Sequence, residues 1–485
     1  MHSKGSNMKP AANVALLKRI PQVEEVLKQP SIQKLEETLP RFLLANCVRS
    51  EITALRKSIL AGEEPEFNAE SVAEASCKRT LKFMAPSLRR IINATGVVIH
   101  TNMGRSVMAP QAIDAVIDAI KGYSTCEYNT DKMKRGSRHE HCERLLATLT
   151  GAEAAIAVNN NAAAVVLVLS EFAKDKEAIV SRGELIELGG SFRIPDIMDQ
   201  SGAHMVEVGT TNKTHPKDYA NAINEDTAMM LKIHKSNYQL IGFTESVTLN
   251  ELREIADKRE KETGQKVLVF EDLGSGSFVA LERYGARAEP TVADSVAGGA
   301  DLVSFSGDKM LGGPQAGIVV GKKEYIDRLK KNPLARVVRL DKMTIAALEG
   351  TLRLYLQGED AINTIPTVRM LSESAEDVRV RSEKLKDLIE AGIPEGMAQV
   401  RVVPEISRAG GGSLPMYDID TYAVEVFPLK GSALDCEQYL EQRCPIPIVA
   451  RIARKAVLCD PRTFIDEEEL EATAQGIIGY FESIR

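Results

Sequence analysis

The sequence predicts a three-part protein: a small helical N-terminal module, a large α/β domain and a smaller α+β domain at the C-terminus. From about residue 90 to 345, strand-like apolar runs alternate with helical patterns, which is typical of a largely parallel sheet covered by helices on both faces. Before this region, apolar residues recur at three- and four-residue spacing, and after it strand-like and helical segments are mixed. The chain has 485 residues, 44% of them apolar, enough for about three domains.

The N-terminal module, with a polar linker, is expected over residues 1–85. The helical pattern of residues 13–60 is interrupted at Pro21, Pro30 and Pro40. Residues 1–60 contain ten Lys and Arg against five Asp and Glu, a net charge of +5, whereas the whole chain carries -7. The local excess is consistent with a solvated helical surface or with a docking surface for a polyanion.

The large domain is expected over residues 86–345 and the α+β domain over 346–485. Seven apolar runs are predicted strands of the large domain: residues 153–159, 177–181, 204–209, 228–234, 266–272, 300–306 and 316–321. In open α/β sheets, ligands bind outside the carboxyl ends of the strands. Polar residues that directly follow these runs are therefore the candidates for a functional site.

Cysteine usage and hydropathy indicate a cytoplasmic protein with no membrane segment. The seven cysteines form no CxxC pair, which favours a reducing compartment. No run of 18 or more uncharged apolar residues occurs, and the N-terminus lacks a hydrophobic signal core. His139, His141 and Cys142 stand close together, but no second ligand cluster supports a metal site, and none is expected.

Three asparagines, Asn159 to Asn161, join the first predicted strand to a helix that opens with small alanines. The free N–H groups and positive dipole of such a helix start would suit a phosphate, so Asn160 and Asn161 are predicted to bind a cofactor phosphate. Plain N-capping by asparagine explains the same pattern.

Lys309 directly follows a predicted strand and precedes Gly312, Gly313 and Gly317. A lysine among glycines can be reached by a bulky planar group, as a Schiff-base lysine must be. Asp272 ends the most apolar strand, and a carboxylate there could pair with the protonated ring nitrogen of pyridoxal 5'-phosphate (PLP).

Two further residues complete the predicted cofactor site. Ser306 could add a hydroxyl to the cofactor phosphate, and Asn237 ends another predicted strand close to His234. The phosphate turn, the strand-end Asp and the glycine-flanked Lys, in this order, predict a PLP-dependent transferase of fold type I, the aspartate-aminotransferase fold.

The chain also resembles bacterial L-seryl-tRNA(Sec) selenium transferases along nearly its whole length. The segments that carry the resemblance include "INATGVVIHTNMGRS" (92–106), "KRGSRHEHCERLLATLTGAEAAIAVNNNAAAV" (134–165), "SRGELIELGGSFRIPDIM" (181–198), "VEVGTTNKTH" (206–215), "FSGDKMLGGPQAGIVVGKK" (305–323) and "NPLARVVRLDKMT" (332–344). These segments are long and rare, so a chance similarity is not a serious alternative.

The resemblance implies a reaction and roles for individual residues. Lys309 would hold PLP as an aldimine and remove the seryl α-proton. Loss of water by β-elimination would leave an aminoacrylyl intermediate, which accepts selenium from selenophosphate to give L-selenocysteinyl-tRNA(Sec). Asp308 would act as the acid for hydroxyl loss or position the selenium donor, although a simple turn residue is the alternative.

Arg105, Arg336 and Arg339 match the arginines that bind the selenophosphate anion in this family. Arg336 and Arg339 are three residues apart and are expected to share a helical face. The resemblance further implies that the N-terminal module binds tRNA(Sec). It also implies a homo-oligomer, a decamer built from dimers, in which Arg105 could reach the site from a partner subunit.

Two alternative functions stay open at this point. A paralogous PLP-dependent lyase or sulfur-group transferase would act on a free amino acid or sugar amine, and Arg451 or Arg462 could then clamp a free carboxylate. The other alternative is a tRNA-binding scaffold that has lost catalysis. Intact Lys309 and Asp272 argue against that loss, and the helical N-terminal module argues against the paralogue.

Overall fold

The structure, a computed structural model, describes residues 11–485 apart from 189–191, 236–237, 239, 285–288, 359, 412 and 415–416. Contacts divide the chain into two compact units, Met1–Arg90 and Ile91–Arg485. The first unit ends a little beyond the boundary expected at residue 85, because helix α5 and its C-terminal extension belong to it. No helix in the described part of the chain is long and apolar enough to cross a membrane.

The N-terminal unit is helical, as predicted. Its helices are α1 (Ala11–Arg19), α2 (Val23–Leu27), α3 (Pro30–Glu36), α4 (Arg41–Leu60) and α5 (Ala69–Met84). Pro30 opens α3 and Pro40 caps α4, positions at which a missing N–H costs no helical hydrogen bond. The apolar faces of α2 to α5 form one small core, which includes Val26, Ile32, Leu44, Val48 and Val72.

The second unit contains a seven-stranded sheet in the order β5-β13-β12-β11-β10-β6-β9. Its strands are β5 (Ala154–Val158), β6 (Glu177–Ser181), β9 (His204–Val208), β10 (Thr227–Ile233), β11 (Leu268–Gly274), β12 (Leu302–Ser306) and β13 (Gly317–Gly321). All seven correspond to predicted strands. Only β13 runs antiparallel to its neighbours, since the short connection from β12 cannot make the crossover that a parallel pair requires.

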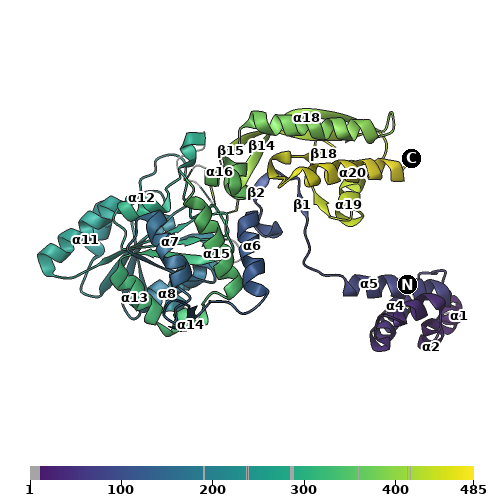
Figure 1. Ribbon diagram of the computed structural model, residues 1–485, viewed down its shortest axis with the longest axis horizontal. Coiled ribbons are helices and arrows are strands. Elements are labelled where there is room, and N and C mark those ends of the chain that lie inside the picture. Colours follow the sequence, from purple (N-terminus) through teal and green to yellow (C-terminus); the bar gives the residue numbers. More distant parts are fainter. Residues whose placement is uncertain are drawn as a thin grey trace, which may run out of the picture. The chain divides into compact units, whose positions relative to one another are not determined.

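Helices cover both faces of this sheet (Figure 1). On one face lie α8 (Asn161–Phe172), α9 (Ile194–Ser201) and α13 (Lys323–Lys331). On the other lie α7 (Glu140–Thr150), α10 (Pro216–Ala222), α11 (Leu249–Thr263), α12 (Val292–Ala297) and α15 (Lys342–Tyr355). The doubly covered architecture predicted for this region is confirmed.

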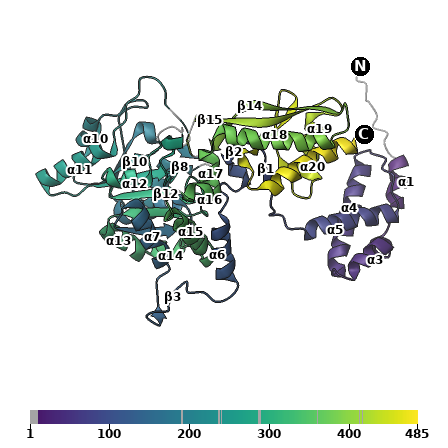
Figure 2. The same ribbon diagram turned by 45° about the horizontal axis from the view of Figure 1, so that its top comes forward.

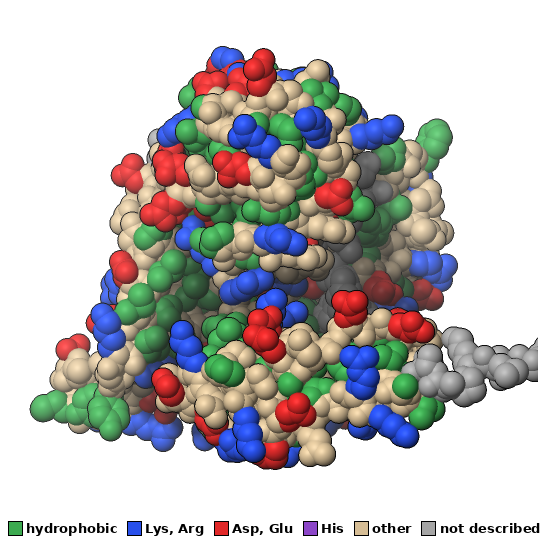
Figure 3. Space-filling view, turned by 90° about the vertical axis from the view of Figure 1, so that its right-hand side faces the viewer, with side chains coloured by type: hydrophobic (Ala, Val, Ile, Leu, Met, Phe, Trp, Pro, Cys, Tyr) green, Lys and Arg blue, Asp and Glu red, His purple; other side chains and the backbone are tan. Residues whose placement is uncertain are grey.

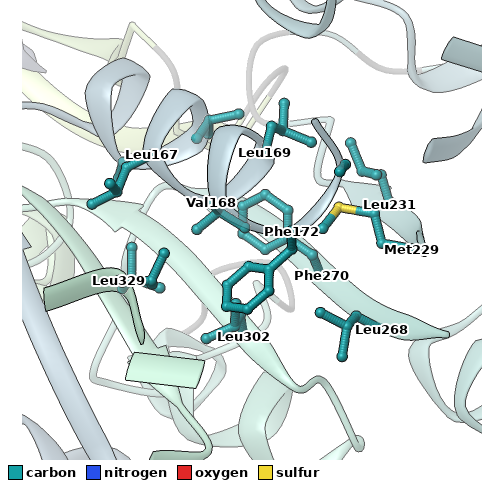
Figure 4. Close-up of a cluster of buried hydrophobic side chains, with 14 of the residues drawn as sticks. Leu167, Val168, Leu169, Phe172, Met229, Leu231, Leu268, Phe270, Leu302 and Leu329 are labelled. Atoms are coloured by element: carbon teal, nitrogen blue, oxygen red, sulfur yellow. The ribbon is translucent and has the colours of Figure 1, made fainter. Parts of the chain in front are cut away.

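Because both faces are covered, the central strands are apolar at successive positions. In β11, Leu268 and Phe270 face α8 and α13 (Figure 4), whereas Val269, with Val267 just before the strand, packs against α11. Burying each such side chain contributes about 1.5–3 kcal/mol to the free energy of unfolding. The polar residues at the strand ends are therefore positioned by well-packed strands.

The remaining sheet has the order β17-β18-β15-β14-β2. Its strands are β2 (Val97–Ile99), β14 (Ala398–Gly410), β15 (Asp418–Pro428), β17 (Arg451–Ala453) and β18 (Ala456–Cys459), and beside it β1 (Ile92–Asn93) pairs with β16 (Ile448–Val449). Three helices accompany these strands: α18 (Ala375–Gly392), α19 (Ala433–Gln442) and α20 (Glu467–Ser483). This part has the α+β character expected of the C-terminal region.

The expected boundaries at residues 86 and 345 differ from the structure. β1 and β2, assigned from sequence to the large domain, pair with C-terminal strands instead. Residue 345 lies inside α15, a helix that packs on the large sheet. Strand partners are chosen by contacts between distant segments, so a local pattern does not reveal them.

The other helices and strands mostly connect the two sheets or lie at their edges. They are α6 (Pro110–Ile120), α14 (Pro333–Val337), α16 (Asp360–Thr364), α17 (Pro366–Ser372), β3 (Tyr128–Asn129), β4 (Lys134–Arg135), β7 (Glu187–Leu188) and β8 (Phe192–Arg193). Four short 3-10 helices, η1 to η4, lie at Thr101–Met103, Arg182–Glu184, Leu281–Tyr284 and Pro461–Thr463. β3 and β4 form a hairpin that projects from the domain in Figure 2.

Candidate active site

Lys309 and Asp272 lie at the carboxyl edge of the large sheet, where ligands of this class of fold bind. Asp272 lies two residues before the end of β11, and Lys309 follows β12, the strand paired with β11. Burial lowers the pKa of the Lys309 ammonium, while the negative charge of Asp272 opposes that shift. A lysine with a lowered pKa has a larger neutral, nucleophilic fraction, as Schiff-base formation requires.

The carboxylate of Asp272 is held by two neighbours. Asn161 Nδ2 donates to Oδ1 at 2.8 Å, and Ser304 Oγ donates to the same oxygen at 3.2 Å. Asp272 is only 4% exposed, and burial raises its pKa, with Asn161 and Lys309 opposing the shift. Ser304 was not a predicted site residue, and its only signal is a hydroxyl within the apolar run of β12.

The two asparagines predicted at the phosphate turn have different partners. Asn160 is the N-cap of α8, and its side-chain oxygen accepts the N–H of Ala163 at 2.9 Å. Asn161 points to Asp272 instead, and its Oδ1 is buried without a hydrogen-bond partner among the described residues. The Asn160 side chain is thus used for N-capping. An anion at this helix start would be bound by the backbone N–H groups of the first turn of α8.

The glycines near Lys309 were expected to leave room for a planar ligand, but in the structure they allow close packing of neighbouring segments. A Cβ on Gly317 would lie 2.0 Å from the carbonyl oxygen of Asn160, and one on Gly312, where φ is +72°, would lie 2.4 Å from Ile365. These glycines let neighbouring segments pack closely around the lysine loop, so they do not leave an open face for a planar ligand. The local sequence could not distinguish the two uses.

Two other predicted cofactor residues can be placed only in part. Ser306 ends β12, is buried, and pairs with Gly317 in the sheet, three residues before Lys309. Asn237 lies outside the described residues.

Arg105 and Asp308 form an ion pair beside Lys309. Arg105 Nη1 lies 2.8 Å from Asp308 Oδ2. Ser106 reinforces the contact, since its N–H donates to the carbonyl of Asp308 at 3.2 Å and its hydroxyl to that of Lys309 at 2.5 Å. The backbone of Arg105 is left-handed, with φ of 63°, a conformation that costs a non-glycine residue about 1–3 kcal/mol.

This ion pair bears on two expectations. Arg105 contacts Asp308 within its own chain, and a contribution of Arg105 to the site of a partner subunit stays a prediction. Asp308 is 6% exposed and has a charged partner, so it is more than a turn residue. The ion pair fixes the Asp308 carboxylate beside Lys309, which suits the positioning of a ligand, and the acid role stays a prediction.

Arg336 and Arg339 lie in a different group of basic side chains. They line a cavity of about 410 Å³ together with Glu127, Arg135, Arg138, Lys330, Lys331 and other residues. Arg339 Nη1 is 3.8 Å from Glu127 Oε1. Arg105, Asp308 and Lys309 are not among the lining residues, so the structure does not bring the three predicted arginines together in the described part of one chain.

The expected helical face shared by Arg336 and Arg339 is also absent. α14 ends at Val337, and Arg339 lies in an extended segment that bridges to Val158. The N–H of Asn159 donates to the carbonyl of Val338 at 2.9 Å, so the cavity adjoins the phosphate turn. Tertiary pairing with β5 has overridden the local helical spacing.

His234 and Glu289 form a second polar pair at the sheet edge. His234 Nε2 lies 3.1 Å from Glu289 Oε1, and the N–H of His234 donates to the carbonyl of Asp272 at 2.9 Å. Glu289 is 5% exposed. Glu289 was not a predicted site residue, and it has no local sequence signal because the contact joins segments 55 residues apart.

Arg462 and Arg451 were the two candidates for a carboxylate clamp. Arg462 is fully buried, and it donates to three carbonyl oxygens, those of Met370, Glu373 and Asp420 at 3.0, 2.9 and 2.7 Å. The guanidinium of Arg462 thus stabilises the fold through these hydrogen bonds. Arg451 lies 3.9 Å from Glu405, a carboxylate of the small sheet.

The histidines and cysteine of the "RHEHCE" segment contact neighbouring elements. His141 Nε2 is 3.2 Å from the carbonyl oxygen of Cys126, and burial raises the pKa of the Cys142 thiol to about 12. In the described ranges, no group of three or more His, Cys, Asp or Glu side chains is arranged to hold a metal ion.

Comparison with known proteins gives evidence about the family of this chain that is independent of the geometry of the site. Residues 91–465 match the family model "L-seryl-tRNA selenium transferase", and residues 17–56 match "Selenocysteine synthase N terminal". The L-seryl-tRNA(Sec) selenium transferase of Alkaliphilus oremlandii is 46% identical over 462 residues, which cover 94% of this chain and 97% of the relative. That of Geobacter sulfurreducens is 45% identical over 457 residues, with coverage of 94% and 97%.

Among solved structures, D-glucosaminate-6-phosphate ammonia-lyase superposes with a TM-score of 0.56 at 20% identity, covering 83% of this chain and all of that one. This likeness concerns the fold alone. The predicted fold type I architecture of PLP-dependent enzymes is confirmed.

Proposed function

The chain belongs to the L-seryl-tRNA selenium transferase family, and we propose on this basis that it converts L-seryl-tRNA(Sec) into L-selenocysteinyl-tRNA(Sec). The observation that carries the proposal is the convergence of Lys309, buried Asp272 and the Arg105–Asp308 pair at one edge of the sheet. Such an arrangement supplies an amine, a carboxylate partner and a fixed cation within one site.

The residues of the site fit PLP. Burial favours the neutral amine of Lys309, and the positive end of α8 lies at the same sheet edge. We propose that Lys309 and Asp272 hold the cofactor, with Asn161 steadying Asp272 and with the Asn160 turn and Ser306 near the phosphate. Bound there, PLP would stabilise negative charge at the seryl α-carbon.

The chain's own groups account for binding and proton movement. The amine of Lys309 can take the proton from the seryl α-carbon, and burial, which lowers its pKa, increases the neutral fraction of that amine. Asp272, fixed by Asn161 and Ser304, holds its carboxylate in one orientation. Asp308, fixed by Arg105, positions the incoming selenium donor.

We propose selenophosphate as that donor, with Arg105, Arg336 and Arg339 as its anion-binding residues. Arginine forks suit a multiply charged phosphorus oxyanion. The basic cavity lined by Arg336 and Arg339 supports the assignment, since its lining carries more positive than negative side chains. Arg105 would act beside Lys309, and the other two from the cavity that adjoins the phosphate turn.

The N-terminal unit is proposed to bind tRNA(Sec). Its match to the family's N-terminal model and the net charge of +5 over residues 1–60 support this. Residues 1–60 contain acidic as well as basic side chains, and Figure 3 shows Lys and Arg interspersed with Asp and Glu over the protein surface in view. Discrete phosphate contacts are therefore expected rather than a uniform field. By family resemblance we also propose a cytoplasmic homo-oligomer, a decamer built from dimers.

The test combines PLP-loaded protein with serylated tRNA(Sec) and labelled selenophosphate. Selenium transfer to the aminoacyl-tRNA is expected for the wild type. Lys309→Ala should abolish it, and a chain of residues 91–485 should transfer far less from the same tRNA concentration. A protein whose PLP absorbance responds to free amino acids but not to seryl-tRNA would instead be a paralogous lyase.

A further inference from the structure

We propose that His234, held by Glu289, is the acid that protonates the seryl oxygen as it leaves. The inference rests on the proposed function and deepens it by naming a catalytic residue. Hydroxide is a poor leaving group, so a β-elimination from a seryl ester needs a proton donor within reach of the oxygen.

His234 is fixed at the reacting edge of the sheet by two hydrogen bonds. Its backbone N–H donates to the carbonyl of Asp272 at 2.9 Å, directly after Ile233, which pairs with Asp272 in the β10–β11 ladder. Its ring Nε2 lies 3.1 Å from Glu289 Oε1. Within the part of the chain that the structure describes, Nδ1 has no hydrogen-bond partner, and we assign this atom to the substrate.

Burial and charge around the ring suit a proton donor. The His234 side chain is 23% exposed and that of Glu289 5%, so Glu289 is buried while part of the imidazole is accessible. Asp272 and Glu271 interact electrostatically with His234, and Lys309 interacts with Glu289, the partner of His234. Three of these four groups around His234 are carboxylates.

The other candidates at the site have different tasks. Lys309 is assigned to the cofactor and to the α-proton. Asp272 is 4% exposed and hydrogen-bonded to Asn161 and Ser304, and Asp308 is paired with Arg105. Among the described residues, His234 is therefore the group at this edge whose side chain is not assigned another task and whose second ring nitrogen has no hydrogen-bond partner.

The step balances as the loss of water. Lys309 takes the proton from the α-carbon, the Cβ–O bond breaks, and its electron pair leaves with the oxygen. The oxygen receives a proton from Nδ1 of the His234 imidazolium and departs as water. The neutral imidazole, still hydrogen-bonded through Nε2 to Glu289, regains a proton from solvent before the next turnover.

The test compares two leaving groups in single-turnover selenium transfer: tRNA(Sec) charged with serine and the same tRNA charged with 3-chloroalanine. Chloride leaves without a proton, so it does not need an acid. His234→Gln is expected to slow transfer from seryl-tRNA by about 10²- to 10⁴-fold and from chloroalanyl-tRNA by no more than about threefold. Glu289→Gln should also slow transfer from seryl-tRNA more than transfer from chloroalanyl-tRNA, but by a smaller factor than His234→Gln.

A matched control is the exposed pair of His215 and Glu245, whose Nδ1 and Oε1 are 3.0 Å apart. His215→Gln and Glu245→Gln should leave both rates unchanged. A second readout does not depend on activity: ¹⁵N NMR of the histidine rings should show a proton on His234 Nε2 in the wild type and a changed signal in Glu289→Gln. Thermal unfolding checks that the variants are folded.

Equal slowing of both substrates would overturn the proposal in favour of a structural role for His234. Retention of full activity on seryl-tRNA by His234→Gln would also overturn it. A wild-type protein that transfers selenium to neither substrate would refute the proposed function itself, and this outcome is distinct from the other two.

Discussion

The guanidinium of Arg105 lies 2.8 Å from the carboxylate of Asp308, although 203 positions separate these residues in the chain. Arg105 follows η1 near β2, a strand of the small sheet, and Asp308 follows β12 of the large sheet. The contact therefore joins the two sheets of the second unit beside Lys309. Substitution of either residue should weaken binding of the selenium donor more than binding of the cofactor.

Arg105→Gln is expected to raise the KM for selenophosphate by about 10- to 150-fold, the equivalent of a lost charge-assisted hydrogen bond of about 1.5–3 kcal/mol. Initial rates of selenium transfer at varied donor concentration measure this. The Lys309–PLP absorbance should be unchanged. An unaltered KM together with lost absorbance would mean that the pair serves the cofactor.

The double variant Arg105→Gln, Asp308→Asn tests whether the two residues act as a unit. Coupled residues are non-additive, so the double variant should be no worse than the poorer single variant. If the effects of the two single substitutions on the KM for selenophosphate simply add in free energy, Arg105 and Asp308 contact the donor independently.

Asn161→Ala is expected to weaken PLP binding by about 5- to 150-fold. The substitution leaves the buried Asp272 carboxylate without one of its two donors, a cost of about 1–3 kcal/mol. Spectrophotometric titration of apo-protein with PLP gives the dissociation constant.

Asn160→Ala is the matched control for that experiment. It removes only the N-cap of α8 and should lower the free energy of unfolding by about 1 kcal/mol, with a smaller effect on PLP affinity. Equal weakening of PLP binding in both variants would contradict the assignment of Asn161 to Asp272.

The pH dependence of Lys309 reactivity follows from its pKa shift. Burial lowers the pKa from the ordinary value of 10.5, so the amine of the apo-protein should react with an acylating reagent with a midpoint below that pH. The Asp272 charge raises the pKa, so Asp272→Asn should move the midpoint to lower pH still. Mass spectrometry of the modified peptide at each pH measures both. A midpoint that rises in Asp272→Asn would contradict the sign of the interaction.

Gly317→Ala is expected to destabilise the protein strongly. The new Cβ would lie 2.0 Å from the carbonyl oxygen of Asn160, and backbone on both sides leaves little room for relaxation, so a loss of about 3 kcal/mol or more is expected. Gly122→Ala, where a Cβ meets no atom within 4 Å, should change stability by less than about 0.5 kcal/mol. Denaturant unfolding followed by circular dichroism measures both variants.

Arg462→Met is expected to cost stability rather than substrate binding. It removes a fully buried guanidinium and leaves three carbonyl oxygens without their donor, so we expect a loss of about 2–5 kcal/mol in the free energy of unfolding. Exposed Arg443→Met serves as the control. A fully stable Arg462→Met protein with a raised KM for a free amino acid would revive the carboxylate clamp and the paralogous lyase.

Short stretches of sequence were sufficient to predict the seven strands, the helical N-terminal module and the positions of Lys309 and Asp272. Each of these rests on a local signal: an apolar run, a three- and four-residue spacing, or a polar residue directly after a buried strand. A rule of topology then places the ends of parallel strands at one edge of the sheet. The resemblance to the family likewise depends on rare contiguous segments, so it was visible before the fold.

Side-chain partners and domain membership became known only from the folded chain. β2 belongs to the C-terminal sheet, Asn161 turns to Asp272, and Arg339 leaves the helix that its spacing suggested. Gly317 makes room for Asn160, and Glu289 reaches His234 from another segment. In each case, contacts between residues distant in the chain outweigh the local preference, because burial and hydrogen bonding in the core stabilise one arrangement that no single segment encodes.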